Sequence, residues 1–147
     1  MARGSRVVLN REALDEVERG LADGVFGIAS AIATRAAERA PDEPPYGEGL
    51  VDHGGAAVWV RGRKVAEMTT GAPGAVAKPR GLKVTNQEHD IVGAAGFDFP
   101  AMFQEIGTVH QPARPFVTPA ALEVIGSDAQ IILSKEMGRH LAKVGRA

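Results

Sequence analysis

The side chains best suited to acid–base or metal chemistry are four histidines, and they lie far apart in the sequence: His53, His89, His110 and His140. Helical zinc sites place two histidines four residues apart, and none of these four has such a neighbour. The chain has no cysteine, which excludes thiolate nucleophiles and cysteine-bound metals. A site assembled from His53, His110 and nearby acids therefore stays open as the alternative interpretation, that of a small enzyme.

Other sequence patterns of catalysis are missing. The chain contains no G-x-S-x-G nucleophile pattern, no phosphate-binding G-x-x-x-x-G-K-[ST] pattern and no G-x-G-x-x-G dinucleotide pattern. Close pairs of acids, such as Asp15 with Glu18, fall on faces that we expect to be solvated, whereas paired-acid catalysis needs carboxyl groups in contrasting environments. We therefore expect a protein that is not an enzyme and that binds no cofactor and no metal.

Charge is balanced along the chain, with 17 basic and 18 acidic residues. Six cations could still gather where a hairpin turn meets a flexible loop: Arg61, Arg63, Lys64, Lys78, Arg80 and Lys83. No aromatic residues are interleaved for base stacking, so we expect at most a non-specific contact with DNA. The chain shows neither an apolar window of membrane-spanning length nor a signal-peptide pattern, so we expect no membrane contact and assembly in a cytoplasm.

A long helix is predicted for residues 11–40. Asn10 is a good N-cap, Glu12 suits the first turn, and Pro41 ends the helix. Apolar residues recur between them at steps of three and four: Leu14, Val17, Leu21, Val25, Ile28 and Ile32. Such a stripe must pack against other elements of the fold.

Three glycines fall within this predicted helix, at Gly20, Gly24 and Gly27. Each costs about 1 kcal/mol relative to alanine in a helix interior. Two interpretations remain open: a tolerated kink, or close packing against another subunit. Small side chains further along would help the second: Ala29, Ala33 and Ala36.

The middle of the chain is predicted to form about four strands. Residues 56–61 and 64–68 read as a hairpin, with Gly62-Arg63 as a type II′ turn and Trp59 as a core anchor. Residues 82–85 and 89–95 read as a second pair. Between the pairs, residues 69–80 form a long flexible loop, of the kind that is functional or disordered.

A second helix is predicted from Thr118, as N-cap, and Pro119, as first helical residue, to the C-terminus. Residues 126–128 interrupt its pattern. The order of elements indicates an α+β fold in a single domain of residues 1–147, with an antiparallel sheet of about four strands packed by the long N-terminal helix and the C-terminal helix. Because only 5% of residues are aromatic, the core must rely on Val, Ile, Leu and Ala.

The most distinctive stretch covers residues 96–116. Three of the five phenylalanines fall within seven residues, and a fourth follows near three prolines: Phe97, Phe99, Phe103 and Phe116. Aromatic side chains so close to Gly107 and to prolines predict a rigid, irregular, apolar connection. Such a connection either seals the core or anchors an interface, since aromatic residues are enriched at both.

Two blocks within this stretch resemble a family of structural proteins from the neck and tail end of long-tailed bacteriophages. Phe99 and Phe103 precede the first block, Glu105-Ile106-Gly107-Thr108, and the second is Pro112-Ala113-Arg114-Pro115-Phe116, followed by a proline-led helix. The N-terminal helix that ends in Ala40-Pro41 is also similar. The resemblance covers about 25 residues closely, and the two blocks in this order and spacing make it fairly specific.

The resemblance implies a non-catalytic α+β subunit of the virion, a tail-completion, tail-terminator or head-to-tail joining protein. Its expected partners are copies of itself in a ring, hexameric in expectation, and other neck or tail-tube proteins. We expect the interface residues within the distinctive stretch, with Glu105 and Arg114 as a charge pair, and loop residues docking on a neighbour or the DNA channel. These candidates are Phe97, Phe99, Phe103, Glu105, Gly107, Thr108, Arg114, Pro115 and Phe116, with Lys78 and Arg80 in the loop. A cellular adaptor unrelated to virions is the remaining alternative.

Overall fold

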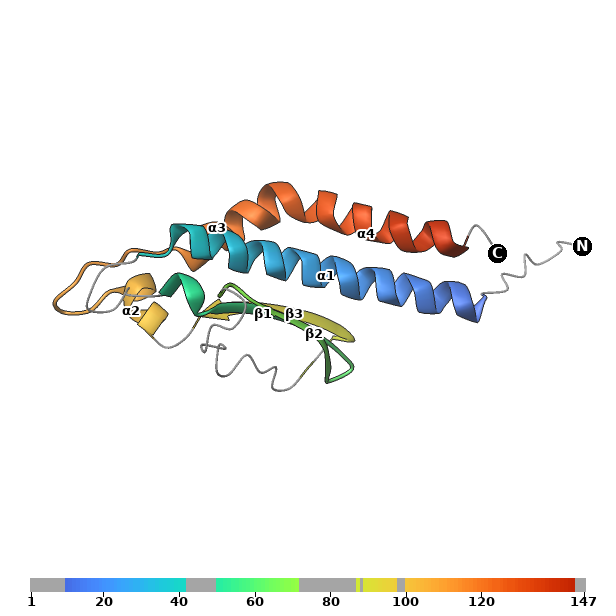
Figure 1. Ribbon diagram of the computed structural model, residues 1–147, viewed down its shortest axis with the longest axis horizontal. Coiled ribbons are helices and arrows are strands. Elements are labelled where there is room, and N and C mark those ends of the chain that lie inside the picture. Colours follow the sequence, from blue (N-terminus) through green and yellow to red (C-terminus); the bar gives the residue numbers. More distant parts are fainter. Residues whose placement is uncertain (1–9, 42–49, 72–86, 88, 98–99, 145–147) are drawn as a thin grey trace, which may run out of the picture.

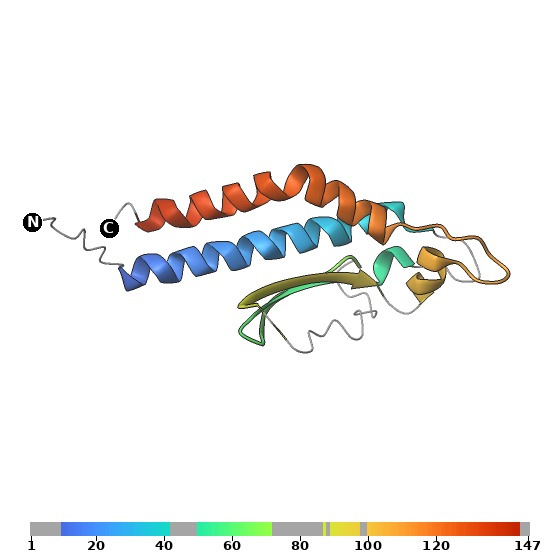
Figure 2. The ribbon, with the colours of Figure 1, turned by 180° about the vertical axis from the view of Figure 1, so that it is seen from behind.

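The protein consists of a small antiparallel sheet, a long helix lying on it, and a second long helix lying on the first (Figures 1 and 2). The computed structural model describes residues 10–41, 50–71, 87, 89–97 and 100–144. The elements are α1 (Arg11–Arg39), the short 3-10 helix η1 (Leu50–Asp52), β1 (Gly54–Val60), β2 (Arg63–Thr69), β3 (Ile91–Phe97), α2 (Pro100–Ile106), α3 (Val117–Glu123), η2 (Val124–Asp128) and α4 (Ala129–Val144). The predicted α+β fold, with long helices at both ends of the chain, is confirmed.

Helix α1 begins and ends where the sequence predicts. The side chain of Asn10 accepts a hydrogen bond from the backbone N–H of Glu12 at 2.9 Å, which satisfies one of the free donors of the first turn. The helix runs without a break to Arg39, and Ala40 caps it in an extended conformation, as a residue before proline prefers. The glycines therefore do not interrupt α1.

The sheet contains three described strands, in the order β2-β1-β3, rather than about four. Both pairings are antiparallel, and β1 is the central strand. The expected strand at residues 82–85 lies outside the described residues, as does most of the expected loop, including Lys78 and Arg80. Within the described part of the chain, β3 pairs with β1 and so joins the first hairpin directly.

The hairpin turn lies one residue earlier than predicted. Val60 pairs with Arg63, which leaves Arg61 and Gly62 as the two central residues. Their φ angles are 47° and 81°, and positive values at both positions are the requirement of a type I′ turn, not of type II′. Distant residues stabilise this turn: the carbonyl oxygen of Asp90 accepts from the Arg61 N–H at 2.8 Å, and the side chain of Gln87 accepts from Gly62 at 2.7 Å.

One face of the sheet packs directly against α1. A Cβ built on Gly93 in β3 would lie 2.6 Å from the Cγ1 of Val25, so only glycine allows the sheet to come this close. Val58, the partner of Gly93 in β1, is buried on the same face. Trp59, its neighbour, points to the opposite face and is also buried, which confirms its place in the core.

Alanine dominates the core. Most buried apolar residues are alanines of α1, β1, α2 and α3: Ala22, Ala29, Ala33, Ala36, Ala37, Ala56, Ala57, Ala101 and Ala120. The expected contribution of Leu and Ile is smaller, because several of these residues are exposed. Ala29 and Ala33 pack on Ala56 of the sheet, so small side chains let the layers approach closely.

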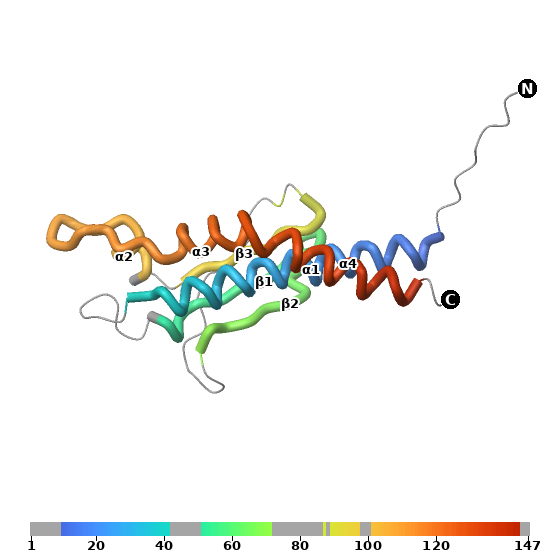
Figure 3. Tube along the Cα trace, turned by 90° about the horizontal axis from the view of Figure 1, so that it is seen from above, coloured from blue at the N-terminus to red at the C-terminus, as the bar shows by residue number. Residues whose placement is uncertain are grey.

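The three glycines of α1 are where α4 packs. A Cβ on Gly24 would lie 2.5 Å from Leu133 Cδ1, and one on Gly27 would lie 2.8 Å from Ile132 Cγ2. At Gly20 the nearest atoms belong to Met137 and His140. Close packing is thus the correct interpretation, but the partner is the C-terminal helix of the same chain, and Figure 3 shows α4 crossing over α1.

The C-terminal helix is continuous from Val117 to Val144 but widens into a π-helical turn, η2, at Val124–Asp128. This is where Gly126 and its neighbours interrupt the predicted pattern. The hydroxyl of Ser127 donates to the carbonyl oxygen of Glu123 at 2.7 Å and so occupies one of the displaced acceptors. Among the described residues, no helix is both long and apolar enough to cross a membrane.

Candidate functional site

The two sequence blocks of the distinctive stretch fold into one corner, joined by Glu105. This residue lies in the last turn of α2, and its carboxylate reaches the start of α3. One oxygen accepts hydrogen bonds from the backbone N–H groups of Phe116, at 2.6 Å, and Val117. The other accepts from the Thr118 hydroxyl at 3.0 Å. Glu105 therefore caps α3 in place of a local side chain.

Because of this tertiary cap, the helix begins earlier than predicted. Thr118 was expected as the N-cap, but the N-cap residue is Phe116, which makes no side-chain cap hydrogen bond. An anionic side chain at a helix N-terminus is favoured by the helix dipole as well as by the free N–H donors. The helix can begin two residues early because a residue from the first block supplies the acceptor.

Gly107 sets the direction of the chain between the blocks. Its φ is +75°, and a Cβ there would lie 2.7 Å from the backbone nitrogen of Ala113. Both requirements restrict this position to glycine. Beyond it, Thr108 and Gln111 exchange two backbone hydrogen bonds, at 2.8 and 3.3 Å, and close a tight turn. Gly107 and Thr108 thus shape the corner.

The aromatic candidates differ in how deeply they are buried. Phe116 is 1% exposed and packs edge-on against Phe97, with ring centroids 5.0 Å apart. Together with Ala36, Ala101 and Ala120, these rings close one end of the core. Phe103 is half-buried on α2. Phe99 lies outside the described residues.

Arg114 and Pro115 are exposed on the irregular segment that leads to Phe116. The backbone N–H of Arg114 donates to the carbonyl oxygen of Gln104 at 2.6 Å, which ties this segment to α2. The carboxylate of Glu105 is engaged by the start of α3. The charge pair between Glu105 and Arg114 stays a prediction.

The corner also exposes large apolar side chains that sequence reasoning did not select. Met102, Ile106 and Val109 are 45%, 70% and 98% exposed. Val109 lies at the tip of the turn that Thr108 and Gln111 close. A rigid turn that holds an apolar side chain fully in solvent is suited to contact another protein. The proximity of these residues to the two blocks was visible in the sequence, but their exposure was not.

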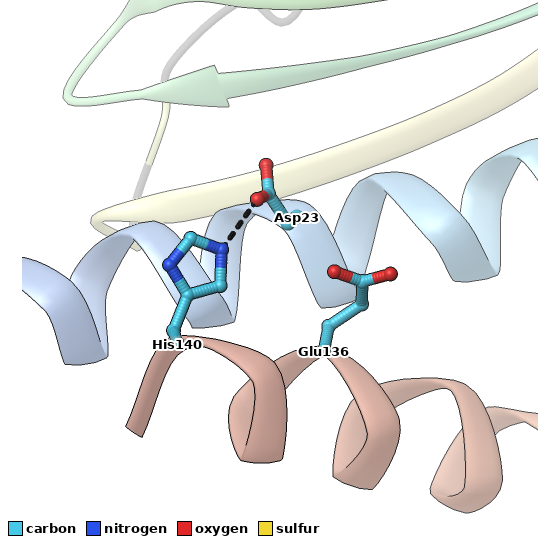
Figure 4. A group of neighbouring side chains, drawn as sticks. All are labelled: Asp23, Glu136 and His140. Atoms are coloured by element: carbon cyan, nitrogen blue, oxygen red, sulfur yellow. Dashed lines mark hydrogen bonds and ion pairs between the residues drawn. The ribbon is translucent and has the colours of Figure 1, made fainter. Parts of the chain in front are cut away.

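A second constellation, missed entirely by sequence reasoning, centres on His140 (Figure 4). His140 in α4 is 4% exposed, and its two ring nitrogens lie 2.7 Å from carboxylate oxygens of Glu16 and Asp23 in α1. A Cβ on Gly20 would come within 3.3 Å of His140 Cβ, so that glycine makes room for the ring. The arrangement joins α1 to α4 through a buried polar contact.

The electrostatics indicate an imidazolium held between two anions. The hydrogen bond to Glu16, and then the one to Asp23, raise the pKa of His140 above its ordinary value of 6.5. The same contact with His140 holds the pKa of Glu16 below its ordinary value. Both ring nitrogens then donate, which neutral histidine cannot do.

Asp23, Glu136 and His140 could also serve as metal ligands, since their ligand atoms lie within 4.8 Å of one another. However, Arg139 already bridges the two carboxylates, at 3.2 Å to Asp23 and 2.8 Å to Glu136. With a proton on each ring nitrogen of His140, every group in this cluster has a partner. The arrangement works as an ion network that fixes one helix on the other.

An open groove of about 340 Å³ runs beside this network, between the helix pair and the hairpin. Its walls are largely apolar, from Val58, Val60 and Val65. The titratable groups at its rim are engaged in ion pairs: Glu18 with Arg61, and Asp23 with His140 and Arg139. The groove therefore offers apolar contact rather than acid–base chemistry.

The remaining candidates are the two histidines of the enzyme alternative and the cations of the hairpin. His110 is exposed on the turn of the corner, and His53 is half-buried just before β1. In the predicted cationic patch, Arg61 pairs with Glu18, and Lys64 pairs with Glu67 at 3.2 Å and lies over the Trp59 ring. The positive charges of Arg61 and Lys64 are thus neutralised by carboxylates of the same subunit, which weakens the case for phosphate binding at the hairpin.

No family model, no curated protein and no solved structure matches this chain.

Proposed function

We propose that the protein is a structural virion subunit of the phage neck or tail end, a ring-forming tail-completion or tail-terminator protein that joins the tail tube to the head connector. The observation that carries this proposal is the Glu105 cap. It explains why the two blocks occur together at their spacing: the first block supplies the acceptor and the second supplies the N–H donors. The two blocks that carry the resemblance are therefore one structural unit.

The shape of that unit suits a joining role. The corner is fixed by the Gly107 backbone, the Thr108–Gln111 turn and the Glu105 cap. Val109 and Ile106 of the corner are exposed to solvent, and α2, with which the corner begins, lies at one end of the molecule (Figure 1). Exposed apolar side chains on a preorganised backbone bind a partner with little loss of conformational freedom. The partner would be a neighbouring copy or a tail-tube protein.

The test is particle assembly in a host that carries the gene within a prophage. After deletion of the gene, induction should give filled heads and tails that are not joined, as seen by negative-stain electron microscopy. The intact gene supplied in trans should restore joined particles. Val109→Asp should fail to do so, whereas Val109→Ile, which keeps the apolar surface, should succeed. Joined, infectious particles from the deletion strain would refute the proposal.

A further inference from the structure

One imidazole ring holds the free ends of α1 and α4 together. Glu16, Gly20 and Asp23 follow one another in α1 at steps of four and three, so they lie on one side of that helix. Gly20 leaves room for the ring of His140, and the two acids lie about one turn before and one turn after this gap. Nδ1 of the ring faces Glu16 and Nε2 faces Asp23, each at 2.7 Å (Figure 4). We call Glu16, Asp23 and His140 the clamp.

The clamp holds both carboxylates only while its ring carries two protons. A neutral imidazole has one N–H donor and one bare nitrogen, which is an acceptor. A bare nitrogen 2.7 Å from a carboxylate oxygen would place two lone pairs against each other with no proton between them. Because His140 is 4% exposed, water has little access to relieve such a contact. Loss of one proton therefore breaks one of the two contacts.

The two acids differ in what each would lose. The side chain of Glu16 is 17% exposed, whereas that of Asp23 is 47% exposed and regains water by a small rotation. The hydrogen bond to Glu16 is also the larger of the two that raise the pKa of His140. Each acid keeps an arginine, since Arg19 lies 2.8 Å from Glu16 and Arg139 lies 3.2 Å from Asp23. Release of Asp23 therefore costs less free energy than release of Glu16.

Other charged groups from both helices and from the hairpin surround the clamp: Glu18, Arg19, Glu136, Arg139, Lys143 and Arg61. Glu18 pairs with Arg61, and Glu136 pairs with Arg139. Burial of the ring and the charge of Lys143 lower the pKa of His140, whereas the contacts with the two clamp acids raise it. The clamp acids are therefore the groups that keep the ring charged.

We propose that the contact between α1 and α4 is a pH-sensitive clamp, in which His140 binds Glu16 and Asp23 when doubly protonated and releases Asp23 when it loses the proton of Nε2. The remaining proton lies on Nδ1, whose N–H donates to Glu16. Free histidine prefers the other tautomer, so this arrangement is specific to the clamp. His140 lies near the end of α4, so the release loosens the last turns of that helix, while Leu133 stays packed on Gly24. The clamp does not depend on the proposed virion role.

Nitrogen-15 NMR of the full-length protein tests the tautomer. The ring signals of His140, identified by their loss in His140→Gln, are followed from mildly acidic to alkaline pH in a buffer with EDTA. Both ring nitrogens should be protonated on the acidic side. On the alkaline side Nδ1 should stay protonated and Nε2 should be bare. A neutral ring with its proton on Nε2 would overturn the inference, as would a ring whose protonation does not change while circular dichroism shows the helices intact.

Hydrogen exchange of the backbone amides tests the release. Across the transition, the protection factors of residues 136–144 should fall about tenfold, as expected for the loss of one charge-assisted hydrogen bond, while those of α3 stay constant.

Asp23→Asn keeps the shape of the side chain, and its amide can donate to a bare Nε2. In this variant we expect the transition at a pH lower by about one unit and no fall in protection. Glu38→Gln, at an exposed acid of α1 outside the clamp, is the matched control and should behave as the wild type. Constant protection in the wild type, or an equal fall in Asp23→Asn, would refute the release of Asp23.

Discussion

Alanine substitution at Gly24 and at Gly138 should change stability in opposite directions, although both glycines lie in helix interiors. Alanine is favoured over glycine there by about 1 kcal/mol, so without other contacts each substitution would stabilise the fold. Gly138 is such a case, since a Cβ there meets nothing within 4 Å. We expect Gly138→Ala to raise the free energy of unfolding by about 1 kcal/mol.

At Gly24 the new methyl group would lie 2.5 Å from Leu133 Cδ1 and 3.4 Å from Leu133 Cα. The second distance is an ordinary van der Waals contact, but the first is a clash, so the side chain of Leu133 must move out of its packed position between the helices. Overpacking of this kind costs about 1–3 kcal/mol. After subtraction of the gain in helix propensity, we expect Gly24→Ala to lower the free energy of unfolding by about 1 kcal/mol.

The two variants should therefore differ by about 2 kcal/mol, or roughly 4–8 °C in Tm for a chain of this size. Urea unfolding followed by circular dichroism measures the difference. Equal stabilisation by both alanines would refute the close approach of α4 to α1.

Three further predictions concern the cap and the ion network. Glu105→Ala should lower the free energy of unfolding by about 1–2 kcal/mol, because it removes the N-terminal cap of α3, and urea unfolding would show the loss. Because the pKa of His140 is raised, the stability that this residue contributes is complete below pH 6.5 and is lost as the pH rises through its folded-state pKa. Because the pKa of Glu16 is lowered, its contribution is complete above pH 4.5 and is lost as the pH falls below that value. Tm should thus be highest between these limits, and His140→Gln should flatten the alkaline decline; an unchanged profile in that variant would contradict the assignment. Zinc at 100 µM should leave Tm unchanged at pH 6, because protons and Arg139 already satisfy Asp23, Glu136 and His140; a rise in Tm that His140→Gln abolishes would indicate a metal site instead.

Local signals in the sequence predicted the ends of elements well. Asn10 and Pro41 mark the two ends of α1. Each acts within one turn of the helix, so its effect depends only on neighbours in the sequence. The hairpin was found for the same reason. The predicted turn type was wrong, because the strand register and the hydrogen bonds that Gln87 and Asp90 accept determine which two residues occupy the turn. Those bonds come from a segment about 25 residues away.

Long-range partners were the part that the sequence could not supply. The glycine spacing in α1 indicated a closely approached face, but not that α4 of the same chain would occupy it. Glu105 was selected as a charged partner, yet its contact with the start of α3 replaces a cap that Thr118 appeared to provide locally. His140 had no neighbour in the sequence to suggest chemistry, because Glu16 and Asp23 lie more than a hundred residues away.

The distribution of side-chain size links the fold to assembly. Within the described residues the core is built largely of alanine, whereas Ile106, Leu122, Ile125 and Ile131 are more than 60% exposed. Burial of an alanine removes little apolar surface from water, so this subunit leaves much of its hydrophobic driving force unused when it folds alone. Contact between copies would bury the larger side chains. We therefore expect the free energy of unfolding to rise with protein concentration.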